Sequence, residues 1–116
     1  MISIALILGV SILLGATLIV KYWNKVIEVM KRAIYKLQTM VEGVLVGSAV
    51  FIRKVGEKFQ NRTKHYSRTN LGKWEETIVT YELEENEVPD EYKNYAVLDN
   101  EYDLTKELEL QLKESR

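Results

Sequence analysis

The first twenty residues, Met1 to Val20, carry no charged side chain, and twelve of them are Ile, Leu or Val. Twenty helical residues rise about 30 Å, which matches the hydrocarbon core of a bilayer. A cleaved signal peptide would need a basic stretch before the apolar run and a small-residue cleavage motif after it, and neither is present. The run therefore predicts an uncleaved transmembrane helix over residues 1–22.

Charge is separated along the chain instead of mixed. The net charge is −1, but residues 21–73 hold 12 Lys and Arg against 3 acidic residues, and residues 74–116 hold 4 against 14. This separation favours a lipid bilayer or a polyanion as partner over an ordinary water-soluble enzyme. The basic residues directly after the apolar run predict one pass through a membrane, with the N-terminus outside and the C-terminal domain cytoplasmic.

Residues 23–43 are predicted to form an amphipathic helix that continues the first. Neither Pro nor Gly occurs from Asn24 to Glu42, and apolar residues recur at helical spacing. A heptad seam, extended back through small residues of the apolar run, predicts a homo-oligomer assembled through Ala5, Gly9, Ala16, Trp23, Val26, Met30, Ala33, Leu37 and Met40. Two alternatives stay open: the helix lies apolar face down on the membrane surface, or it packs on the chain's own β-domain.

Residues 44–116 are predicted to form a cytosolic, mainly-β domain with an acidic C-terminal part. Turn signals at Gly56-Glu57-Lys58 and Asn70-Leu71-Gly72 predict a small antiparallel β-meander over residues 44–55, 59–69 and 73–84. A membrane-dipping segment is the alternative for residues 44–55. The expected fold class is therefore membrane α + β.

The C-terminal part gives two weaker signals. Pro89 followed by Asp90 and Glu91 predicts the start of a helix. Further on, Leu108, Leu110 and Leu112 alternate with polar residues, which suggests a fourth strand, and a helix starting at Thr105 is the alternative.

The second predicted strand carries the clearest candidate site. Because side chains alternate between the two faces of a strand, Arg62, Lys64, Tyr66 and Arg68 share one face. Cations neutralise phosphates and an aromatic ring can stack on a base, so this face predicts a nucleic-acid or nucleotide ligand. The full predicted set is Arg53, Lys54, Lys58, Arg62, Lys64, Tyr66, Arg68 and Lys73. The alternative is a solvated face whose cations meet lipid headgroups or the chain's own acidic part.

Enzyme signatures are missing from the sequence. His65 is the single histidine, there is no cysteine, and Ser67 has no evident acidic partner for a catalytic arrangement with His65. No phosphate-binding, dinucleotide, zinc-protease or kinase pattern occurs, and the acidic residues lack calcium-loop spacing. We therefore expect a protein without catalytic activity, cofactor or metal.

As an architecture, the chain resembles the small membrane effectors of bacterial anti-phage defence, of the Hailong kind. The resemblance is carried by the Met1–Val20 run, the seam through Met30 and Leu37, and the basic strand from Arg62 to Arg68. It implies a homo-oligomeric ion channel in the bacterial inner membrane, gated by a nucleic-acid ligand that a partner nucleotidyltransferase makes.

The expected function is thus a gated pore lined by uncharged residues such as Ser3, Ser11 and Thr17. The alternatives are a non-conducting membrane anchor or adaptor that docks a protein through its acidic C-terminal region, and a holin-like toxin.

Overall fold

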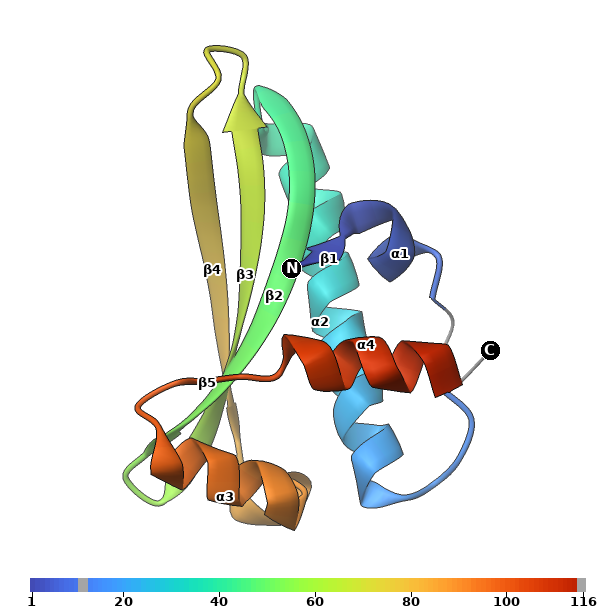
Figure 1. Ribbon diagram of the computed structural model, residues 1–116, viewed down its shortest axis with the longest axis vertical. Coiled ribbons are helices and arrows are strands. Elements are labelled where there is room, and N and C mark those ends of the chain that lie inside the picture. Colours follow the sequence, from blue (N-terminus) through green and yellow to red (C-terminus); the bar gives the residue numbers. More distant parts are fainter. Residues whose placement is uncertain (11–12, 115–116) are drawn as a thin grey trace.

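The computed structural model describes residues 1–10 and 13–114, with side chains as far as Leu112. Figure 1 shows a curved antiparallel sheet with one long helix along one face and the remaining helices at its lower part and side. In chain order the elements are β1 (Ile2–Ser3), α1 (Ile4–Leu8), α2 (Leu18–Met40), β2 (Gly43–Val55), β3 (Lys58–Thr69), β4 (Trp74–Leu83), the 3₁₀ helix η1 (Glu85–Glu87), α3 (Asp90–Leu98), β5 (Tyr102–Asp103) and α4 (Thr105–Glu114).

The predicted meander is confirmed. The strands β2, β3 and β4 are adjacent and antiparallel, with Val50 opposite Thr63 and Thr63 opposite Val79. Both predicted turns are present, and each uses a glycine with positive φ, 63° at Gly56 and 81° at Gly72. Residues 44–55 lie in β2, which pairs with β3 on one side and with β1 and β5 on the other.

The predicted transmembrane helix over residues 1–22 is wrong. Among the described residues, no helix is both long and apolar enough to cross a membrane. The described residues of the run instead form β1, α1, non-helical segments at residues 9–10 and 13–17, and the first turn of α2, and they bury Ile2, Ile7 and Leu13 in the core. Glycines explain the break: α1 ends at Gly9, and Gly15 has a φ of 127°, which a helix does not allow.

The polar residues of this run have local structural roles. The hydroxyl oxygen of Ser3 accepts a hydrogen bond from the backbone N–H of Leu6, and that of Thr17 accepts one from Val20, so they cap α1 and α2. Ser11 lies outside the described residues. The predicted lining of a pore by Ser3 and Thr17 is therefore replaced by helix capping.

The amphipathic helix is present as α2, which runs across the predicted boundary between residues 22 and 23. Its apolar stripe packs on the chain's own sheet: Trp23, Val26 and Met30 are fully buried, and Ala33 and Leu37 are partly buried. The alternative that this helix packs on the chain's own β-domain is therefore the one that describes α2. Of the residues predicted to assemble an oligomer, the exposed ones are Ala5, Gly9, Ala16 and Met40, and a homo-oligomer stays a prediction.

The C-terminal prediction is half right. A helix does start after Pro89, as α3, but the residues from Thr105 form helix α4 and not a fourth strand. The decisive spacing is four residues, because Leu104, Leu108 and Leu112 are buried together while Leu110 is exposed.

Hydrogen bonds between buried polar groups join the helices to the sheet. The Tyr22 hydroxyl of α2 donates to Asn61 Oδ1 over 2.6 Å, and Asn61 Nδ2 lies 2.7 Å from the Tyr81 hydroxyl of β4. The Trp23 indole N–H donates to the Tyr92 hydroxyl of α3 over 2.9 Å. The buried side chains of Tyr22, Trp23 and Asn61 thereby have partners, which fixes α2 in one position on the sheet.

Candidate functional site

The two faces of β3 differ sharply. Phe59, Asn61, Thr63, His65 and Ser67 are all buried beneath the helices, as their alternation requires. The opposite face carries Arg62, Lys64, Tyr66 and Arg68. We call this side of the sheet the outer face. By strand register it includes Phe51 and Arg53 of β2, Lys58, Gln60, Arg62, Lys64, Tyr66 and Arg68 of β3, and Trp74, Glu76, Ile78, Thr80 and Glu82 of β4.

Two cations at the centre of the outer face hold one carboxylate. Glu101, in the loop before β5, lies 2.5 Å through Oε2 from Arg62 Nη1 and 2.6 Å through Oε1 from Lys64 Nζ. All three side chains are about four-fifths buried. Burial acts to raise the pKa of the Glu101 carboxyl, but the hydrogen bonds from Lys64 and Arg62 outweigh it and lower that pKa. Glu101 is therefore an anion bound by the outer face.

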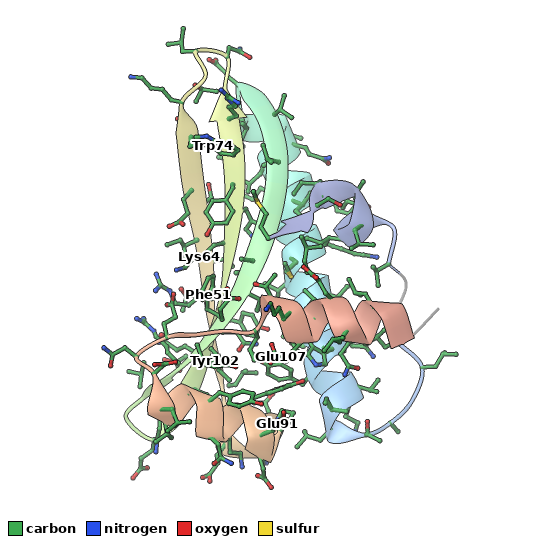
Figure 2. All side chains as sticks on the ribbon, viewed as in Figure 1. Phe51, Lys64, Trp74, Glu91, Tyr102 and Glu107 are labelled. Carbon is green, nitrogen blue, oxygen red and sulfur yellow. The ribbon has the colours of Figure 1, made fainter. Side chains whose placement is uncertain are left out.

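Aromatic rings lie beside these cations. The Lys64 ammonium sits over the Phe51 ring, 4.0 Å from its centroid, and Figure 2 shows the two side chains next to each other on the sheet. Further along, the Arg68 guanidinium carbon is 5.7 Å from the centroid of the Trp74 ring, whose side chain is more than half exposed. Burial and the Glu76 carboxylate raise the pKa of Tyr66, so its hydroxyl stays protonated.

Arg62 retains an unused hydrogen-bond donor. Its Nε is buried and has no partner among the described residues, although Nη1 bonds Glu101. A buried donor without a partner typically costs about 1–3 kcal/mol. A larger anion with additional oxygens could bond this group, which the single carboxylate of Glu101 leaves unpaired.

Of the other predicted ligand residues, Arg53 and Lys58 have the alternation of the outer face, and Lys54 and Lys73 do not. Arg53 is on the outer face and donates from Nε to Gln60 Oε1 over 2.9 Å. Lys58, at the start of β3, lies 3.4 Å from a Glu84 carboxylate oxygen and 3.9 Å from one of Glu82. Lys54 and Lys73 are exposed but belong to the opposite alternation, so the register does not place them on the outer face.

Sequence reasoning missed Phe51, Trp74 and Glu101. Phe51 and Trp74 could have been found by extending the alternation of β3 to its neighbours, once the register was known. Glu101 gave no signal, because it is 37 residues from Lys64 and reaches it through the path of α3 and the following loop. The alternative that the acidic part neutralises the chain's own cations is what the structure shows for Glu101, Glu82 and Glu84.

The single histidine belongs to the core. His65 Nδ1 is 2.7 Å from Ser48 Oγ and Nε2 is 2.9 Å from Thr63 Oγ1, and all three side chains are fully buried. The predicted neighbour Ser67 is not its partner. Burial lowers the pKa of His65 from 6.5 to about 4. The imidazole is therefore enclosed in the core, with the hydroxyl groups of Ser48 and Thr63 as its hydrogen-bond partners.

An acidic, tyrosine-rich surface lies on α3, on β5 and at the start of α4. Tyr95 of α3 and Tyr102 of β5 stack with ring centroids 4.4 Å apart, and the Tyr95 hydroxyl donates to Glu91 over 2.7 Å. Figure 2 shows Glu91, Tyr102 and Glu107 in this region. Within the described residues, no cluster of three or more His, Cys, Asp or Glu side chains could hold a metal ion. The stacked rings of Tyr95 and Tyr102 attach α3 to β5.

Comparisons with protein-family models, with curated proteins and with solved structures find no match. The resemblance to Hailong-type effectors stays a prediction. The candidate site is therefore judged on its own geometry.

Proposed function

We propose that the protein binds a short single-stranded oligonucleotide on the outer face of its sheet. The observation that carries this proposal is the pair Arg62 and Lys64, which already holds one carboxylate with two charge-assisted hydrogen bonds. In the proposed complex a phosphate group takes the place of the Glu101 carboxylate.

The length of the site supports a polymeric ligand. From Arg62 to Arg68 the strand rises about 20 Å, with a polar or cationic side chain at every second residue. Tyr66 and the exposed ring of Trp74 lie on the same face and offer stacking platforms for bases. A row of cations with aromatic rings between them is the usual surface for single-stranded nucleic acid.

On the outer face, a phosphate of the ligand competes with the carboxylate of Glu101. Glu101 must leave Arg62 and Lys64 before a phosphate binds, and removing its charge should therefore strengthen binding. Partly buried ion pairs of this kind are worth about 0.5–1 kcal/mol each, so Glu101→Gln is expected to tighten oligonucleotide binding about tenfold.

The proposal is tested by fluorescence anisotropy of a labelled oligonucleotide. We expect Arg62→Glu with Lys64→Glu to abolish binding and Glu101→Gln to tighten it. Lys54→Glu with Lys106→Glu makes the same change in net charge away from the outer face and should have little effect. A slope near +2 in log Kd against log salt would match about three phosphate contacts.

Two results would refute the proposal. If neither the wild type nor Glu101→Gln binds the oligonucleotide, an oligonucleotide is not the ligand. If the two charge-reversal pairs weaken oligonucleotide binding equally, the outer face is not the binding site, because binding then responds to net charge alone. Circular dichroism of each variant establishes that the fold is retained. The gated pore depended on a membrane-spanning helix, so it forms no part of this proposal.

A further inference from the structure

The second basic surface of the molecule is the solvent side of α2. Positions spaced three and four residues apart on this helix are exposed: Leu18, Lys21, Lys25, Glu28, Arg32, Tyr35 and Lys36. They lie within one arc of about 100° on the side opposite the buried stripe. We call this the cationic face of α2, and it is separate from the outer face of the sheet because α2 packs on the other side.

The cationic face has an unbalanced charge. It holds four cations and one acid, and that acid, Glu28, forms its ion pair with Arg32. Among the described side chains, none of the acidic groups forms an ion pair with Lys21, Lys25 or Lys36. Three ammonium groups are therefore available to an anionic partner along about 22 Å of helix.

Two exposed leucines precede these cations in the sequence. Leu14 is 95 % exposed and Leu18 is 42 % exposed, directly before Lys21 and Lys25. The backbone of Leu13 is fixed to α2, since the Asn24 side chain accepts a hydrogen bond from the Leu13 N–H over 2.8 Å and donates one to the Leu13 carbonyl over 3.3 Å. Leu13 is buried while Leu14 points outward.

We propose that the cationic face of α2 and Leu14 bind the surface of an anionic lipid bilayer. Lipid phosphates complement Lys21, Lys25 and Lys36, and the layer below the headgroups accepts Leu14 and Leu18. A nucleic acid would satisfy the charges but offers no apolar medium to these leucines. The protein would lie on the membrane by a helix whose apolar stripe stays in its own core.

Vesicle co-sedimentation tests the charge requirement. We expect binding to vesicles of phosphatidylcholine and phosphatidylglycerol in equal parts, and none to pure phosphatidylcholine. Each basic residue near an anionic surface contributes about a factor of five, so Lys21→Glu with Lys25→Glu should weaken binding at least about 25-fold. The pair Lys54→Glu with Lys106→Glu, both exposed and away from α2, is the matched control for net charge.

A fluorescent label tests the orientation. The chain has no cysteine, so Leu14→Cys carries a polarity-sensitive dye at one position. We expect a blue shift on the anionic vesicles for this variant and none for Leu71→Cys, which is 87 % exposed in the β3–β4 turn. Figure 1 places that turn at the opposite end of the molecule from the start of α2.

The proposal fails if the wild type ignores anionic vesicles, if both charge-reversal pairs weaken binding equally, or if the two labelled positions respond alike. It also fails if Lys21→Glu with Lys25→Glu abolishes binding to duplex DNA and leaves vesicle binding unchanged, since the face would then serve a nucleic acid.

Discussion

At the scale of single residues, burial decides what a polar side chain does. Ser48, Thr63 and His65 have the types expected of a reactive site, yet they are enclosed between α2 and the sheet. Arg62, Lys64 and Glu101 are only partly enclosed and keep their charges. The alternation along β3 predicted this division because strand periodicity is local, whereas the pairing of His65 with Ser48 depends on the β2–β3 register.

His65 makes stability depend on pH. Its pKa is about 4 in the folded protein and 6.5 when unfolded, so the unfolded chain binds the extra proton between these values. Its contribution is complete above pH 6.5 and declines as the pH falls towards 4, by up to about 3 kcal/mol. Urea unfolding at several pH values measures this.

The variant His65→Gln is the control, because its amide can bond Ser48 and Thr63 but does not titrate. The slope between pH 6.5 and 4 should flatten in this variant. Since His65 is the single histidine, NMR titration assigns its pKa directly. A value near 6.5 in the folded protein would contradict the prediction.

At the scale of elements, close approach matters as much as propensity. The two-residue strand β1 pairs with β2 at Gly47, where a Cβ atom would lie 2.8 Å from the Ile2 carbonyl oxygen. Hydropathy could not reveal this contact, because the pairing joins residues more than forty positions apart. Helix α2 and the meander, in contrast, follow from local periodicity and turn chemistry.

Gly47→Ala should therefore separate β1 from β2. Crowding of this kind typically costs about 1–3 kcal/mol, and backbone is the harder obstacle because the neighbouring Met1 side chain can move. Hydrogen exchange should show faster exchange in β1 while the β3–β4 ladder stays protected. Unchanged exchange in β1 together with unchanged stability would contradict this assignment.

At the scale of the whole molecule, the apolar N-terminal run belongs to the same core as the sheet. A membrane and a protein core both favour burial of Ile, Leu and Val, so hydropathy alone does not distinguish them. The glycines at 9 and 15 and the caps at Ser3 and Thr17 were the local signs of a broken segment. The path that brings Ile2 and Ile7 onto the sheet was not readable from the sequence.

Two substitutions in this run distinguish the interpretations. Ile7→Asn places an amide in the core and should cost about 3 kcal/mol or more, whereas Leu14→Asn changes an exposed side chain and should stay within about 0.5 kcal/mol. Thermal unfolding followed by circular dichroism compares the two. Equal effects of both substitutions would show that the run does not pack as described.

The positions of the short strands β1 and β5 also have a consequence while the chain is being synthesised. Both pair with the same edge of β2, β1 at residues 47–48 and β5 at residues 51–52, although they come from opposite parts of the chain. While the protein is being made, the stretch Phe51–Ile52 has no neighbour on that side until Tyr102 and Asp103 have been added. An uncovered strand edge is a template for pairing with other chains. A nascent chain halted before residue 102 should therefore self-associate more readily than the finished protein.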